Sequence, residues 1–202
     1  MTSQQLDVRA LPKPQKHPAI FAAFTALPLG GSFILVNNHD PVHLHEEFET
    51  DLAGGYDWTY VERGPEVWRI RIGKRTSTAL PHLLTNTVDE SAAHAPDAAG
   101  AVWKLQVSNR DLDANIIALP PGGVIEKHTG LDVDVVIHVL AGSGNLITEF
   151  ELPCLLKPGD LMWLPRRSER KFVAGEHGLR YLTVHQRRKA LVLEPPERRR
   201  TS

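Results

Sequence analysis

Apolar side chains in the first third of the chain alternate between strand-like and helix-like spacing. A short strand over 6–11 precedes helical spacing over 17–27, and an apolar run over 33–36 predicts a buried strand. Apolar residues then recur at every fourth position over 44–52, which predicts a second helix. Two segments of period two, on either side of a Gly-Pro turn, predict an antiparallel pair. The order β-α-β-α-β-β suits a two-layer domain, a four-stranded sheet with both helices on one face.

Local signals predict where the second helix begins and ends. Asp40 is expected to cap its start, with Pro41 at the first helical position, and Gly54-Gly55 is expected to end it. The two amides of Asn37 and Asn38 are expected to be exposed at the strand-to-helix corner. Beside a helix N-terminus, they make this corner a candidate anion site.

The pattern changes in the middle of the chain. Residues 76–100 are rich in Ala, Thr, Ser and Asp without a sustained period, and they are expected to link a first domain, 1–75, to a second, 101–190. The second domain has many short apolar strands, separated by turns such as GSGN at 142–145 and AGEHG. With no helical pattern between them, these strands predict a β-sandwich or barrel, so the fold class is α+β in two domains. The tail 191–202 is rich in Pro and Arg and is expected to be disordered.

Charge and composition exclude several classes of function. The chain has 202 residues, 42% of them hydrophobic, and 23 basic against 24 acidic side chains, so it lacks the positive surface of a nucleic-acid-binding protein. No apolar run approaches the ~18 residues that span a bilayer. The first twenty residues lack the apolar core of a signal peptide. A cytoplasmic protein with no membrane partner is expected. The single cysteine, Cys154, excludes an intramolecular disulfide, and its apolar strand predicts a buried, inert thiol.

Residues 118–176 resemble the cupin family of RmlC-like jelly-roll barrels. Gly122 and His128 keep the opening spacing of the first cupin motif, and Gly142 keeps its closing glycine. Gly159 and Pro165 match the first half of the second motif. The resemblance implies an all-β jelly-roll barrel in the second domain. It also implies a homodimer that pairs through outer strands.

The metal ligands of cupins are mostly replaced in this sequence. In metal-binding cupins a His-x-His pair, a Glu and a later His converge inside the barrel. The corresponding positions are His128, Gly130, Val135 and Arg170. A guanidinium stays protonated and offers no lone pair to a metal. One imidazole does not hold a divalent ion, so no cofactor is assigned from the motif.

A rearranged metal site is the alternative. A bulge after Gly130 would turn acidic and imidazole side chains of the next strand inward, and a late strand could add another. Such a set would suit iron, manganese, zinc or nickel. The competing interpretation has alternating Val and Ile residues filling the core between outward-facing polar residues. The spacing favours this second interpretation. The candidate donors are His128, Asp132, Asp134, His138 and His185.

An arginine-rich turn offers a different chemistry. Arg170 occupies the position of a lost metal ligand, so it is a candidate to bind a carboxylate or phosphate through its planar fork, with Arg166 nearby. Trp163 and Tyr181 are expected to add an aromatic wall. The competing interpretation is a solvated basic turn that protects an edge strand.

Residues 6–74 resemble a bacterial domain of unknown function of the 2249 type, with NNHDP and GPEVWRIRI as the distinctive segments. The resemblance implies the fold of the TusA/SirA sulfur carriers. Those carriers use a Cys-Pro-x-Pro motif, whereas this chain reads Leu11-Pro12-Lys13-Pro14. A leucine cannot carry persulfide sulfur, so sulfur transfer by this domain is excluded.

Two functions remain open from the sequence. The first is a non-enzymatic protein that binds a small anionic molecule or regulates through it, with Arg170 at the mouth of the barrel. The second is a metal-dependent cupin enzyme, an oxygenase or isomerase, with a rearranged site around His128. No phosphate-binding loop, dinucleotide fingerprint or nucleophile elbow is present in the sequence.

Overall fold

A computed structural model describes residues 4–93 and 95–187, and the predicted disordered tail, 191–202, lies outside them. The chain forms two compact units. One unit runs to Leu84 and includes the short segment Gln106–Asn109, and the other comprises Thr85–Leu105 and the chain from Arg110 onward. Within the described ranges, no helix combines the length and apolar character needed to cross a membrane.

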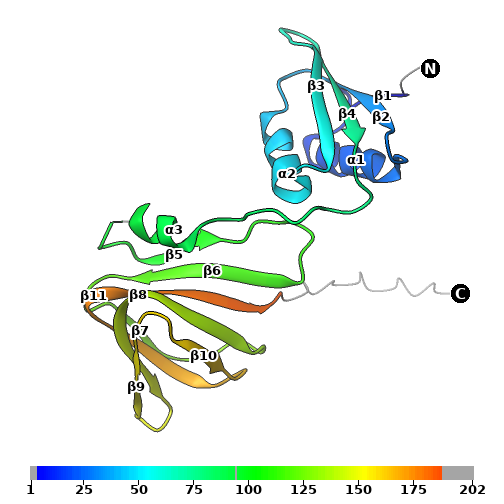
Figure 1. The fold of residues 1–202 in the computed structure, drawn as a ribbon. Helices are drawn as coiled ribbons and strands as arrows, with labels where there is room; N and C mark the ends of the chain where they lie inside the picture. The colour runs from blue at the N-terminus through cyan, green and yellow to red at the C-terminus, as the bar shows by residue number, and fades with distance from the viewer. Residues whose placement is uncertain (1–3, 94, 188–202) are drawn as a thin grey trace, which may run out of the picture. The chain divides into compact units, whose positions relative to one another are not determined.

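The first unit is a small mixed sheet with two helices (Figure 1). Its sheet has the strand order β1-β2-β4-β3, in which only β1 and β2 are parallel. The element order confirms the predicted β-α-β-α-β-β pattern. The elements are β1 (Gln4–Asp7), α1 (Lys13–Ala26), β2 (Ser32–Asn37), α2 (Val42–Leu52), β3 (Tyr56–Glu62) and β4 (Trp68–Lys74).

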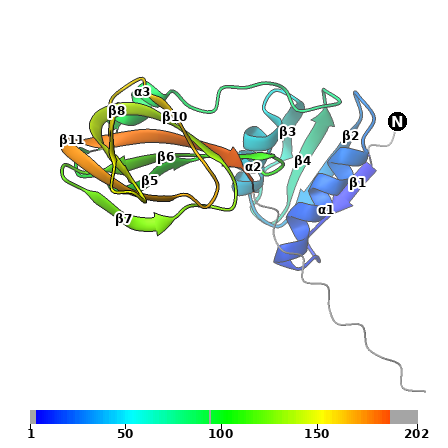
Figure 2. The same cartoon turned by 90° about the horizontal axis from the view of Figure 1, so that it is seen from below.

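Both helices of the first unit contribute side chains to the same apolar cluster. Figure 2 shows the backbone of α1, α2 and the sheet of this unit from a second direction. Phe48 of α2 is fully buried; its ring stacks on Phe21 of α1 with 4.7 Å between centroids and meets Phe24 edge-on at 5.2 Å. Phe33 of β2 lies opposite Ile72 of β4 and belongs to the same cluster. The helical spacing of apolar residues in the sequence thus corresponds to aromatic side chains on the faces of α1 and α2 that contact each other.

The predicted helix ends are correct in one case and wrong in two. Helix α2 ends at Leu52, with Ala53 between it and the Gly54-Gly55 pair, so the predicted end is correct to within one residue. Asp40 does not cap its start, because the Asp40 carboxylate accepts a hydrogen bond from the Tyr60 hydroxyl at 2.8 Å instead. Helix α1 begins at Lys13, earlier than predicted, since Pro14 fits a first turn, where a backbone N–H has no helical partner.

The second unit is built from antiparallel strands. The main path of pairing is β10-β8-β11-β6-β5, with β7 added on β11 and β9 on β8. This path does not return to its start, so the described strands form an open sheet and not the closed barrel that the sequence predicted. Its elements are α3 (Thr87–Ala93), β5 (Gly100–Lys104), β6 (Leu112–Leu119), β7 (Val124–Thr129), β8 (Val135–Thr148), β9 (Pro153–Leu156), β10 (Leu161–Leu164) and β11 (Glu169–Gln186). Helix α3 lies in the expected linker.

Two predicted turns lie inside long strands. Strand β8 continues through 142–145, and β11 continues through AGEHG with a shift of register between Ala174 and Leu179. A Cβ atom on Gly142 would overlap the backbone carbonyl of Gly178. The absence of a side chain at Gly142 therefore lets the backbones of β8 and β11 approach closely at these two residues. The prediction of turns at these glycines was wrong. Glycine is typical of turns, but it is also the residue that a close approach between two backbones requires.

The core of the second unit follows the alternation of β8. Val135, Ile137 and Val139 are buried, while Val136 and His138 are exposed on the other face. Of the two interpretations that the sequence left open, the structure agrees with the one in which Val and Ile fill the core.

Candidate functional site

Arg170 is a buried cation at the start of β11. It lies opposite Thr148 in the ladder with β8 and opposite His128 in the ladder with β7. Only 6% of its surface is exposed. The arginine-rich turn is therefore not uniformly solvated: Arg166 and Arg167 are exposed, and Arg170 enters the interior.

The Arg170 guanidinium has no counter-ion in the part of the chain that the structure describes. Its Nη1 donates to the Ser168 hydroxyl at 3.2 Å, and the Ser168 hydroxyl donates in turn to the carbonyl of Pro165 at 2.8 Å. Burial lowers the pKa of Arg170, and the nearby Tyr181 opposes this shift. A guanidinium nevertheless stays charged at neutral pH, so Arg170 is a buried positive charge that an anion would neutralise.

A cavity of about 570 Å³ opens beside Arg170. This volume lies in the range of pockets that hold small organic molecules, about 300–1,000 Å³. Its polar groups include the hydroxyls of Thr148 and Ser168, next to Arg170. Its apolar side chains include Leu146, Phe150, Leu152, Met162, Trp163 and Leu164.

Thr148 carries an unsatisfied polar atom in this cavity. Its Oγ1 is buried and forms no hydrogen bond with any described residue. Leaving a buried hydroxyl unpaired costs roughly 1–3 kcal/mol. Because Thr148 lies opposite Arg170 in the ladder, the two side chains lie on the same face of the sheet.

The four residues predicted to bind a ligand divide into two pairs. Arg170 and Trp163 line the cavity, although Trp163 lies opposite Val136 in the ladder and is largely exposed at the cavity edge. Tyr181 is buried against Phe172, with 5.1 Å between ring centroids, and is not part of the lining. Arg166 is also outside the lining.

The residues predicted as metal donors lie apart. His138 faces the outer side of β8, and the Asp134 carboxylate accepts a hydrogen bond from the backbone N–H of Arg166 at 2.9 Å. The Nδ1 atoms of His128 and His185 lie at hydrogen-bond distance from the backbone carbonyls of Glu126 and Gln186. Across residues 4–93 and 95–187, no three His, Cys, Asp or Glu side chains are placed to share a metal ion.

Cys154 lies at this cavity and is exposed, so the prediction of a buried thiol was wrong. Its strand, β9, is short and pairs with β8, and Leu155 beside it is exposed as well. An apolar run does not distinguish an exposed edge strand from a core strand, and nothing in the sequence identified Thr148 or Ser168.

The strand-to-helix corner of the first unit holds a second pocket, of about 380 Å³. Asn37 is buried, not exposed as predicted, and its Oδ1 accepts from Lys16 Nζ at 3.3 Å. The Oδ1 of Asn38 lies 3.5 Å from the same ammonium. The amides thus already bind a cation of the chain.

Known proteins are similar to separate parts of this chain. Residues 5–74 match a family described as an uncharacterized conserved protein, DUF2249. No curated protein matches the chain. A relationship to the TusA sulfur carriers stays a prediction.

Solved structures that resemble the chain cover about half of it. A cupin-2 domain protein from Shewanella frigidimarina is 18% identical over 52% of this chain and 95% of its own, with a TM-score of 0.41. KdgF from a Halomonas species is 22% identical over 45% of this chain and 81% of its own, at 0.39. The polyketide cyclase RemF from Streptomyces resistomycificus is 24% identical over 41% of this chain, at 0.38, and the match spans only 61% of the cyclase. The chain thus combines a segment that matches an uncharacterized family with a segment that has cupin-like structural neighbours.

Proposed function

We propose that the second unit binds a small organic anion in the cavity beside Arg170, as a ligand-binding or regulatory protein. The observation that carries this proposal is a guanidinium that is 6% exposed and has only the Ser168 hydroxyl as a polar side-chain partner among the described residues. Burying a charge is unfavourable unless an opposite charge or a set of hydrogen bonds compensates it. A carboxylate or phosphate ligand would supply that charge and match the fork of the guanidinium.

The hydroxyls at the cavity support binding rather than covalent catalysis. A serine nucleophile needs an adjacent base to accept its proton. The Ser168 hydroxyl instead donates to the carbonyl of Pro165, and no described base accepts its proton. The Thr148 hydroxyl likewise has no hydrogen-bond partner among the described residues.

The test combines a binding measurement with a metal analysis of protein purified without a His-tag. Hexanoate is expected to raise the melting temperature of the wild type, because a ligand at a hundred times its Kd stabilises by about 2.7 kcal/mol. It is expected to have no effect on Arg170→Met. Arg166→Met is the matched control, since Arg166 is exposed and outside the cavity lining, and it is expected to respond like the wild type.

Two outcomes would contradict the proposal. The first is an equal response of Arg170→Met and the wild type. The second is a tightly bound equivalent of iron, manganese, zinc or nickel that is lost in His128→Ala, which would support the alternative of a metal-dependent enzyme.

A further inference from the structure

The charges around the cavity restrict which anions it can hold. The ligand class inferred from these charges rests on the proposed function. Among the described residues that line the cavity, Arg170 is the only cation, whereas Glu149 and Glu169 both belong to the lining. The two glutamates are exposed while Arg170 is buried, so negative charge lies at the mouth and positive charge lies deeper.

The negative charge at the mouth is only partly neutralised. Lys127 Nζ lies 3.3 Å from Glu151 Oε1 and 3.5 Å from Glu169 Oε2. One ammonium group is therefore paired with two carboxylates and neutralises only one of their two negative charges. Glu149 forms no ion pair with any residue that the structure describes. A ligand group at the mouth therefore meets an excess of negative charge.

The remaining wall of the cavity is apolar. Phe150 and Leu152 lie in the connection between β8 and β9, and 75% of the Phe150 surface is exposed. Leu146 and Met162 continue this apolar wall. Exposed apolar side chains beside a binding cavity are favourable contacts for the apolar part of a ligand.

We propose that the cavity selects organic monocarboxylates, with the carboxylate at Arg170 and Thr148 and an apolar chain that extends past Met162 toward Phe150. A second negative charge at the far end of the ligand would lie near Glu149 and Glu169. Inorganic phosphate would carry more than one charge at neutral pH and would leave the apolar wall uncovered. Dicarboxylates and phosphate are therefore disfavoured.

Cys154 provides a direct readout because it is the only cysteine and lies at the same cavity. The rate at which uncharged iodoacetamide alkylates Cys154 is measured against increasing hexanoate, adipate, hexanol and inorganic phosphate. Hexanoate, adipate and hexanol have equal carbon chains and differ in charge. We expect half-protection by adipate to need roughly tenfold more ligand than half-protection by hexanoate, as for charges that interact near a protein surface. Hexanol and phosphate are expected to protect still less.

Two variants isolate the charge effect. Glu149→Gln is expected to improve protection by adipate several-fold and to change protection by hexanoate little. Glu176→Gln removes an exposed carboxylate outside the cavity lining and is expected to change neither. Raising the salt concentration is expected to reduce the preference for hexanoate, because exposed charges are screened within about 10 Å at 0.1 M.

The outcomes separate this inference from the function on which it rests. If adipate protects Cys154 as well as hexanoate does, and Arg170→Met abolishes both effects, the selectivity is refuted and anion binding stands. If hexanol equals hexanoate, or no carboxylate protects, both the selectivity and the anion binding are refuted.

Discussion

An ideal Cβ atom on Gly130 would lie 2.6 Å from the guanidinium carbon of Arg170, so the guanidinium occupies the space that any other side chain at position 130 would enter. In the resemblance to cupins, these two positions correspond to two histidine ligands of a metal. The two residues depend on each other, since the Arg170 guanidinium keeps this position only while residue 130 has no side chain. The pair therefore forms one structural unit that holds a buried positive charge.

Gly130→Ala is expected to displace the guanidinium from the cavity and weaken hexanoate binding by about 10- to 100-fold, the equivalent of one hydrogen bond to a charged group. Because the guanidinium is the far end of a flexible side chain, the variant is expected to fold. Isothermal titration calorimetry measures the change. Gly73→Ala is the control, because its nearest neighbours would lie 3.5 Å away, an ordinary contact. Unchanged binding by Gly130→Ala would show that the guanidinium position is unimportant.

Periodicity in the sequence predicted the elements of the first unit and the buried face of β8, because both depend on local alternation of apolar residues. It failed at Gly142 and Gly178, where the glycines mark a close approach between distant strands. A contact between residues far apart in the chain leaves no local pattern. For the same reason, the pairing that leaves the sheet open could not be predicted.

The candidate site was predicted in part. Arg170 was identified because it stands where the resemblance places a metal ligand. The hydroxyl of Thr148 was not, because its lack of a partner depends on which side chains pack around it. The exposure of Cys154 depends on β9 pairing with β8 alone, which is likewise a property of the folded sheet.

Thr148→Val is expected to stabilise the unliganded protein, or leave its stability unchanged, and at the same time to weaken hexanoate binding. The substitution removes a buried hydroxyl that has no described partner, and valine keeps the shape. Thr183→Val is the matched control, because the Thr183 hydroxyl donates to the carbonyl of Asn115 at 3.3 Å. It is expected to lower stability by about 1 kcal/mol and to leave binding unchanged. Urea denaturation and calorimetry measure both effects, and a destabilised Thr148→Val would show that its hydroxyl is already satisfied.

The two faces of β8 are expected to respond differently to the same substitution. Val139 is 1% exposed and Val136 is 39% exposed. Val139→Ala is expected to lower the free energy of unfolding by roughly 2 kcal/mol, from lost burial and the cavity left behind. Val136→Ala is expected to change it by less than about 0.5 kcal/mol. Equal effects in urea denaturation would contradict the assignment of the buried face.

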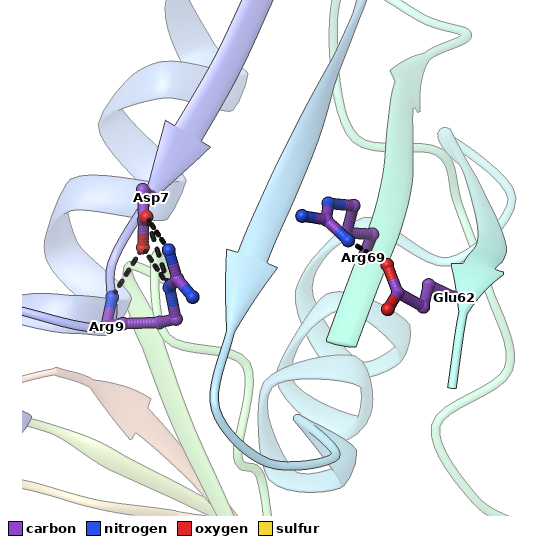
Figure 3. Close-up of polar contacts among 4 residues, drawn as sticks. All are labelled: Asp7, Arg9, Glu62 and Arg69. Atoms are coloured by element: carbon purple, nitrogen blue, oxygen red, sulfur yellow. Dashed lines mark hydrogen bonds and ion pairs between the residues drawn. The ribbon is translucent and has the colours of Figure 1, made fainter. Parts of the chain in front are cut away.

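The carboxyl group of Asp7 is expected to titrate at an unusually low pH. Arg9 donates from Nη2 at 2.7 Å and from Nε at 3.0 Å to this carboxylate, and its backbone N–H adds another bond (Figure 3). These contacts lower the pKa of Asp7 from 3.8 to about 2. Because the folded pKa is the lower one, the stabilisation is complete above pH 3.8 and is lost as the pH falls through about 2.

Arg9→Gln is expected to raise the pKa of Asp7 part of the way back toward 3.8, since the backbone bond remains. Arg69→Gln is the control. Arg69 is paired with Glu62 and acts on Asp7 only as the weakest of the contributing charges, so its loss is expected to shift the pKa of Asp7 less (Figure 3). Carboxyl ¹³C chemical shifts followed from pH 5 to pH 1 measure both values. A larger shift in Arg69→Gln than in Arg9→Gln would mean that long-range charge, and not the hydrogen bonds from Arg9, holds the Asp7 carboxylate ionised.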